Sequence, residues 1–217
     1  MSRPARFGRL ARVYRWMEYF SFGPYLQRCR MLRIAELTTC RRALVYGDGD
    51  GRFLAELVRS APGMRIAAVD ASSEMLRQAA KRRPLEARLV QADALACEVS
   101  ALPEAPFDLI VSHFFLDCFD EQELSSLLAW VNAAVGEDAV WVVSDFAIPH
   151  QPVARQLGRL VVGGLYLAFG LLTGLRTWRL PDHGRVMRER GWRLEDRRTL
   201  LLGLLASERW RRLLSHE

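Results

Sequence analysis

The sequence predicts an α/β domain built on a doubly wound, mostly parallel sheet. Short apolar runs suited to buried strands alternate five times with amphipathic helical segments between residues 43 and 146. Glycine or aspartate follows most of these runs, so the residues suited to ligand binding gather where strands end. With 217 residues and 50% hydrophobic content, the chain is long enough for one full core and too short for two large domains.

The elements of this alternation can be bounded from the sequence. The expected strands are 43–46, 64–69, 87–91, 107–112 and 139–144. The expected helices are 52–60, 71–83 and 121–135. Ser72 is a better N-cap for the second helix than Asp70, and Asp120 caps the third. A helix at 181–190 and two extended runs at 192–201 and 204–211 then close the chain as a hairpin.

Two segments lie outside the alternation. Residues 12–37 have apolar side chains at helical spacing, broken by Ser-Phe-Gly-Pro at 21–24. Residues 160–175 are uncharged but fall short of the ~20 residues that span a bilayer. We expect 1–40 to be an N-terminal helical lid or appendage. Residues 41–217 form the main domain, and 150–180 are inserted in it as a substrate lid or, second, an interfacial anchor.

Charge and cysteine content limit the partners. Lys and Arg number 31 against 25 acidic residues, a net charge of +6, but the arginines are scattered among acids as on solvated faces. No separate nucleic-acid-binding module is evident. The four cysteines lack metal-ligand spacing, which predicts no metal site and a reducing cytoplasm. The first twenty residues do not form a signal peptide, because arginine interrupts them.

A glycine-rich turn joins the first strand to the first helix. Gly47, Gly49 and Gly51 permit positive φ and let a ligand lie against bare backbone, while the helix offers unpaired N–H groups. Asp70, at the end of the second strand, is placed to accept hydrogen bonds from two ribose hydroxyls. Asp93, after the third strand, suits the amino group of a base such as adenine. The pattern predicts a nucleoside-type ligand.

Three motifs in register carry a family resemblance: Val-Tyr-Gly-Asp-Gly-Asp-Gly-Arg at 45–52, Val-Asp-Ala-Ser-Ser-Glu-Met-Leu at 69–76 and Gln-Ala-Asp-Ala at 91–94. Over about 43–145 the sequence resembles the class I S-adenosylmethionine-dependent methyltransferases of small-molecule type, including the quinone-biosynthesis group. The resemblance implies a Rossmann-like sheet of seven strands, ordered 3-2-1-4-5-7-6 with the last antiparallel. It implies S-adenosylmethionine as cofactor, S-adenosylhomocysteine as product, and no metal.

The resemblance also assigns roles to residues. The glycine turn passes under the methionine part of the cofactor, Asp70 holds the ribose, Met75 covers the adenine face, and Asp93 with Ala94 meets the adenine edge. The cofactor-binding residues implied are Tyr46, Gly47, Asp48, Gly49, Asp50, Gly51, Asp70, Ala71, Met75, Asp93, Ala94 and Ser112. The family often has an acid where this chain has Val45. Asp48 or Asp50 is expected to meet the cofactor's ammonium group instead.

The methyl group of a sulfonium is already activated, so in-line positioning supplies much of the catalysis. His113, just past the fourth strand, is the best candidate base for a protonated nucleophile, with a structural histidine as the alternative. Asp117 and Asp145 are candidates for orienting substrate or His113. The expected substrate-contacting residues are Tyr19, Tyr25, His113 and Tyr166.

The apolar lid favours a small lipophilic or aromatic acceptor and no nucleic acid. Two alternatives remain open at this point. One is an NAD-type dehydrogenase, disfavoured because Arg52 stands where a dinucleotide fingerprint has its third glycine. The other is a non-catalytic methyltransferase-like protein bound to a membrane surface or a partner, which the apolar segment and arginine-rich ends favour. We expect a cytoplasmic, bacterial-type monomer or homodimer that makes peripheral membrane contact if 160–175 is an anchor.

Overall fold

The computed structural model describes residues 24–82, 86–149 and 181–213. The expected helix before residue 21 and the apolar segment at 160–175 lie outside these ranges, as do Tyr19 and Tyr166. The predicted division into an appendage, a main domain and a lid insertion therefore stays a prediction. In the described part of the chain, no helix is long and apolar enough to cross a membrane.

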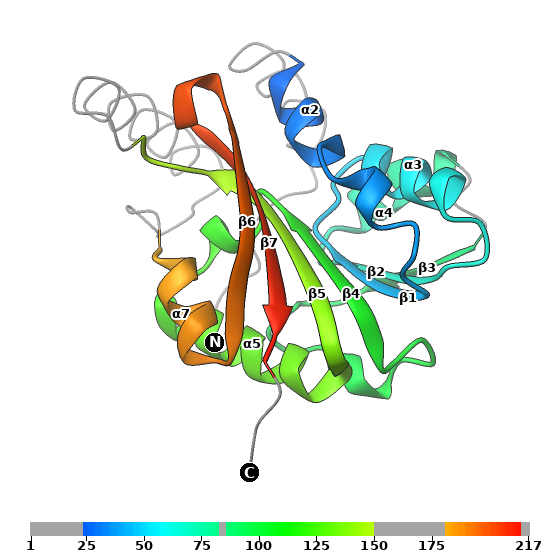
Figure 1. Ribbon diagram of the computed structural model, residues 1–217. Helices are drawn as coiled ribbons and strands as arrows, with labels where there is room; N and C mark the ends of the chain where they lie inside the picture. Colours follow the sequence, from blue (N-terminus) through cyan, green and yellow to red (C-terminus); the bar gives the residue numbers. More distant parts are fainter. Residues whose placement is uncertain (1–23, 83–85, 150–180, 214–217) are drawn as a thin grey trace.

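The predicted fold is confirmed. Seven strands form one sheet in the order β3-β2-β1-β4-β5-β7-β6, and β7 runs antiparallel to both β5 and β6 (Figure 1). Strands β1 to β5 are parallel, and β1 pairs with β2 on one side and with β4 on the other. β3 pairs with β2, and β5 pairs with β4. The strands are β1 Arg42–Tyr46, β2 Arg65–Asp70, β3 Ala87–Gln91, β4 Phe107–His113, β5 Val135–Phe146, β6 Trp192–Leu200 and β7 Leu205–Arg212.

Helices cover both faces of the sheet (Figure 1). On one face, Phe53, Leu54 and Leu57 of α3 pack on apolar residues of β1 and β4. On the other face, the leucine stripe of α5 packs with Met187 of α7 against the alternate residues of the same strands. The helices are α2 Tyr25–Met31, α3 Arg52–Ser60, α4 Ser73–Lys81, α5 Glu121–Ala134 and α7 His183–Glu189, with short 3₁₀ turns η1 Ile34–Glu36, η2 Val99–Ala101, η3 Leu116–Cys118 and η4 Leu201–Gly203.

Several predicted boundaries differ from the structure by one to four residues, and three of the differences have a clear structural cause. β5 begins at Val135 instead of residue 139, because Val135 pairs with Phe107 before an irregularity in the ladder. β4 continues through His113, which pairs with Ser144 and is therefore a strand residue. The last helix begins only after Asp182, whose carboxylate accepts the Arg185 N–H and caps it.

Candidate functional site

The three glycines of the turn after β1 all adopt positive φ, at 60°, 68° and 79° for Gly47, Gly49 and Gly51. A Cβ on Gly51 would lie 2.5 Å from the Cα of Ala79 in α4, and one on Gly47 would lie 2.6 Å from the ring of Phe115. A Cβ on Gly49 would meet nothing within 4 Å. Two glycines therefore allow close packing, whereas the backbone at Gly49 has open space beside it.

Hydrogen bonds hold the strand ends around this turn together. The N–H of Gly47 donates to the Val69 carbonyl at 3.1 Å, and the N–H of Ala92 donates to the Asp70 carbonyl at 3.2 Å. The carboxyl ends of β1, β2 and β3 are thereby fixed side by side. The glycine turn and the predicted ribose and adenine residues consequently share one edge of the sheet.

Asp50 is fully engaged with arginine. Its Oδ1 pairs with Arg52 Nε and its Oδ2 with Arg82, each at 2.9 Å, while Arg82 Nε also donates to the Asp50 carbonyl. Burial opposes ionisation of Asp50, but the two guanidinium groups outweigh it and lower the pKa of the carboxyl. Asp50 thus fastens the turn to the end of α4.

Asp48 has a different environment. Its Oδ2 accepts the Leu54 N–H at 3.0 Å and so satisfies one free donor in the first turn of α3. Its Oδ1 is buried and has no hydrogen-bond partner in the part of the chain described. Burial raises the pKa of Asp48 to about 7, against the pull of this hydrogen bond and the charge of Arg30. The sequence left Asp48 and Asp50 as alternatives for the contact with an ammonium group. Asp48 is the one whose carboxylate has an oxygen without a partner among the described residues.

Asp70 ends β2 and lies beside the start of α4. Its Oδ1 accepts the Ser72 N–H at 2.8 Å, and burial raises its pKa to about 6. Ser72 is the N-cap, as predicted, because its hydroxyl accepts the Met75 N–H. Met75 is half-buried and Ala71 is exposed. The hydrogen bond from Ser72 to Oδ1 therefore fixes the orientation of the Asp70 carboxylate, while Ser72 caps the helix.

The predicted adenine-side residues follow β3. Asp93 is exposed, and its Oδ1 accepts the N–H of Leu95 at 3.0 Å. Ala94 is buried and belongs to the core cluster under α5. Both lie at the same strand-end edge as Asp70.

Aromatic rings occupy the β4 side of the turn. The ring of Phe115 stacks on Tyr46 at a centroid distance of 5.4 Å, with the planes 6° apart, and Phe119 packs edge-on against Phe115. Ser112 lies inside the core, where its hydroxyl accepts the indole N–H of Trp141 at 2.9 Å. Ser112 is fully buried, and its hydroxyl already accepts a hydrogen bond from within the core.

His113 is 2% exposed and packs edge-on against Phe53 of α3 at 4.4 Å. Neither ring nitrogen has a hydrogen-bond partner in the described part of the chain. Burial, followed by the charge of Arg30, lowers the pKa of His113 well below its usual value. The imidazole is consequently neutral at physiological pH, the form in which it can accept a proton.

We expect His113 to show no titration between about pH 6 and pH 8. The measurement is an NMR titration of the histidine ring signals, assigned by comparison with a His113→Gln variant. A midpoint near the ordinary histidine pKa would contradict the buried, neutral ring.

Asp117 and Asp145 lie close together at the ends of η3 and β5. Asp145 is buried and accepts the Phe146 N–H at 2.8 Å. Burial, then the charge of Asp117, raises the pKa of Asp145 well above its ordinary value. The Cys118 thiol donates to Asp117 at 3.6 Å. This acidic group lies beyond β4, on the side of the turn opposite β2.

Helix α2 brings further side chains to this edge. The guanidinium of Arg30 lies 5.0 Å from the centre of the Phe114 ring, and Phe114 itself has a φ of 53°. That strained backbone is held by a 2.7 Å hydrogen bond from the Phe114 N–H to the Ser144 carbonyl. Tyr25, at the start of α2, is 37% exposed, with Arg28 over its ring.

Sequence reasoning missed three residues of this edge: Arg30, Phe114 and Phe115. A run of two aromatics directly after a predicted strand was a usable signal for the phenylalanines. No local signal marks Arg30, because its neighbours Phe114, Asp48 and His113 come from distant parts of the chain.

A family model described as a methyltransferase domain matches residues 43–138, from the first residues of β1 into the start of β5. The antiparallel β7 between β5 and β6 is the sheet order expected for the same group. Residues 43–138 therefore match a methyltransferase domain, and the sheet has the strand order of the class I S-adenosylmethionine-dependent methyltransferase fold. No curated protein matches the sequence.

Solved structures of methyltransferases share the fold. The chain aligns over 94% of its length with 60% of mitomycin 7-O-methyltransferase, at 16% identity and a TM-score of 0.66. It also aligns over 87% of its length with 86% of the N-methyltransferase NodS from Bradyrhizobium japonicum, a structure with bound S-adenosylhomocysteine, at 14% identity and a TM-score of 0.58. Magnesium protoporphyrin IX methyltransferase from Synechocystis, also with bound S-adenosylhomocysteine, aligns over 83% of its length with 87% of this chain, at 16% identity and a TM-score of 0.60. The chain thus spans about 60% of the length of the first of these structures.

Proposed function

We propose that this protein transfers a methyl group from S-adenosylmethionine to a small lipophilic or aromatic acceptor. One observation carries the proposal: the open backbone at Gly49 follows Asp48 directly, and Asp48 and Asp70 are partly satisfied carboxylates that interact electrostatically at the same edge of the sheet. Such a cradle suits a ligand with a cationic amino acid end and a ribose. The match of residues 43–138 to a methyltransferase domain supports it.

The residues of the turn fit this cofactor. The buried Oδ1 of Asp48 lacks a donor among the described residues, and an α-ammonium group would supply one. Asp70 keeps one carboxylate oxygen outside its bond to Ser72, and ribose hydroxyls are suitable donors for it. Asp50 is assigned to holding the loop, because two arginines take up its oxygens. Met75, Asp93 and Ala94 are assigned to the adenine.

The cofactor supplies an electrophilic methyl group on a sulfonium, and this chain's residues position the nucleophile. A neutral His113 at the end of β4 is the group that would accept a proton from a hydroxyl or amine acceptor. Its burial makes it a weak base, so it would accept the proton only after the forming bond to the methyl group has made that proton more acidic. Asp117 and Asp145 would orient a polar group of the acceptor.

The acceptor is assigned to the side of the turn lined by aromatic rings. Phe114 and Phe146 pack at 5.2 Å, and Tyr25 lies exposed at the start of α2. Rings of this kind favour an apolar or aromatic molecule over a highly charged one. A dehydrogenase is disfavoured, since a dinucleotide-binding sheet has the order 3-2-1-4-5-6 and lacks the antiparallel strand between β5 and β6.

Asp70→Asn should weaken the binding of S-adenosylhomocysteine by ~1–3 kcal/mol, because ribose hydroxyls lose a charged acceptor. The variant keeps an oxygen for the Ser72 N–H, so the local turn is retained. Calorimetric titration measures the change.

Glu98→Gln is the matched control, since it removes one carboxylate from the exposed loop after β3. It should leave the affinity unchanged. Equal affinities for the Asp70 variant and the wild type would show that Asp70 is structural only.

A further inference from the structure

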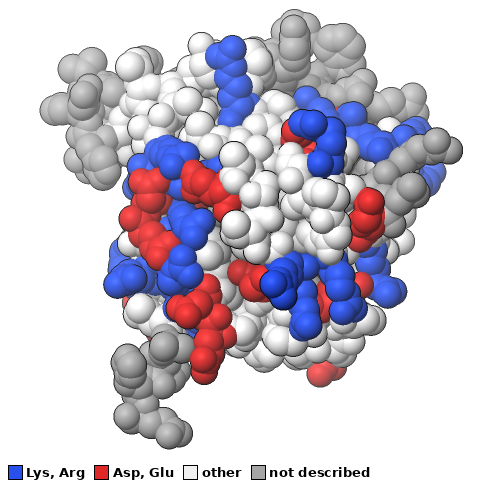
Figure 2. Space-filling view, turned by 45° about the vertical axis from the view of Figure 1, so that its right-hand side comes forward, with Lys and Arg blue, Asp and Glu red and all other residues white. Residues whose placement is uncertain are grey.

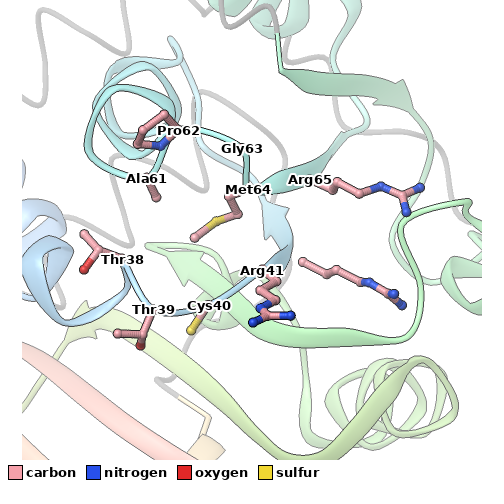
Figure 3. A pocket seen from close by; sticks show the side chains of 10 residues that line it. Thr38, Thr39, Cys40, Arg41, Ala61, Pro62, Gly63, Met64 and Arg65 are labelled. Atoms are coloured by element: carbon pink, nitrogen blue, oxygen red, sulfur yellow. The ribbon is translucent and has the colours of Figure 1, made fainter.

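A hollow lies at the edge of the sheet opposite the glycine turn, where β1 and β2 begin. Its volume is about 470 Å³, and it is lined by residues 38–42 and 61–65. In Figure 3, Arg41 and Arg65 lie toward one side of this hollow, with Ala61 and Pro62 across from them. The hollow is distinct from the glycine turn, which follows the carboxyl end of β1.

Three arginines border this hollow without an ion pair to any of the described residues. Arg42 and Arg65 are Cα partners in the β1–β2 ladder, so two guanidinium-bearing residues stand side by side. Arg65 donates to the Pro103 carbonyl, at 2.8 Å. In the described part of the chain, the side chains of Arg41 and Arg42 have no polar partner. Like charges on paired strands repel, and no carboxylate of that part relieves the repulsion by pairing with them.

Two carboxylates on neighbouring segments already have hydrogen-bond or ion-pair partners. Asp108 accepts the main-chain N–H groups of Arg41 and Arg42, each at 2.8 Å. Glu104 pairs with Arg88 at 2.9 Å. Over much of the face in Figure 2, basic side chains lie beside acidic ones. Elsewhere in the described residues, Arg211 pairs with Glu195. The arginines of this hollow differ from that pattern, because no carboxylate of the described residues pairs with their side chains. Their guanidinium groups can therefore bind an added anion.

We infer that the hollow binds a phosphate group carried on an apolar or aromatic molecule. Guanidinium groups hold phosphate through paired N–H donors, and three arginines line this hollow. Ala61, Pro62 and Met64 provide an apolar wall for the organic part. A phosphorylated small molecule and the headgroup of an anionic lipid share this chemistry.

The test uses phenyl phosphate as the soluble probe and the full-length protein at constant ionic strength. The wild type should bind it, and its thermal midpoint should rise with probe concentration. Arg42→Gln/Arg65→Gln should weaken binding at least tenfold, and so should Arg41→Gln/Arg42→Gln, which leaves the Arg65–Pro103 bond intact. Arg188→Gln/Arg193→Gln removes the same two charges from exposed arginines without an ion pair in the described residues, and this control should bind as the wild type does.

A second arm separates the two sources of phosphate. Vesicles of phosphatidylcholine with phosphatidic acid are sedimented with the wild type and with both double variants. Pelleting that both variants lose supports a lipid headgroup, whereas binding of phenyl phosphate without pelleting supports a soluble ligand. No binding in either arm, or binding that both double variants retain, would overturn the inference. S-adenosylhomocysteine affinity should be unchanged in these variants, so a failure here is distinct from failure of the proposed methyltransferase site.

Discussion

Gly51→Ala is expected to lower the free energy of unfolding by roughly 3 kcal/mol, from two sources. A φ of 79° costs an alanine about 1–2 kcal/mol. The added methyl would also lie 2.5 Å from the Cα of Ala79, and a backbone atom of α4 cannot turn aside. Chemical denaturation of the variant and the wild type measures the difference.

Two other glycines serve as matched controls. Gly63 has a φ of 88° and nothing within 4 Å of where an added methyl would lie, so Gly63→Ala should cost only the backbone term, about 1 kcal/mol. Gly49→Ala should cost the same in stability but should also weaken S-adenosylhomocysteine binding, because its open side is where we place the cofactor. Equal stability losses at Gly51 and Gly63 would show that the contact with α4 is unimportant.

Asp48→Asn should stabilise the protein at pH 8 by ~2 kcal/mol and weaken cofactor binding at the same pH. The stabilisation follows because a buried carboxylate is replaced by a neutral amide whose oxygen can still accept the Leu54 N–H. The loss of binding follows because the amide has no negative charge for the ammonium group. Thermal unfolding and calorimetry at several pH values measure both effects.

The pH dependence has a definite sign. The pKa of Asp48 rises from 3.8 to about 7 in the folded protein. Between these two pH values the folded state keeps a proton on Asp48 that the unfolded state has lost. Its contribution to stability therefore falls as the pH rises from about 4 to about 7, and the advantage of the variant should grow over that window. Wild-type affinity for S-adenosylhomocysteine should rise from pH 6 to pH 8, and the Asp48→Asn substitution should flatten this rise. A variant less stable at pH 8 than the wild type would contradict the burial of a charged Asp48.

The fold was predictable because its signals are local. The bounds of α3 and β3 follow from apolar periodicity, and the capping box of α5 follows from Asp120 and Glu123. The start of β5 was missed because 136–138 reads as a turn, and only the pairing of Val135 with Phe107 extends the strand. Pairing across strands is not visible in a local pattern.

The site was predictable in outline and not in detail. Glycines and acids after strands mark the edge, since all parallel strands end there. The separate roles of the two turn aspartates depend on Arg82, which is distant in sequence from Asp50 and reaches it only when α4 packs on Gly51. The burial of His113 likewise depends on Phe53 from another element. Tertiary packing decides both.

Calorimetric titration of the wild-type protein with S-adenosylhomocysteine at pH 8 tests the central claim most directly. A site made of the open glycine turn, Asp48 and Asp70 predicts saturable one-to-one binding at micromolar concentration. Absence of binding of both S-adenosylhomocysteine and S-adenosylmethionine up to low millimolar concentration would contradict it.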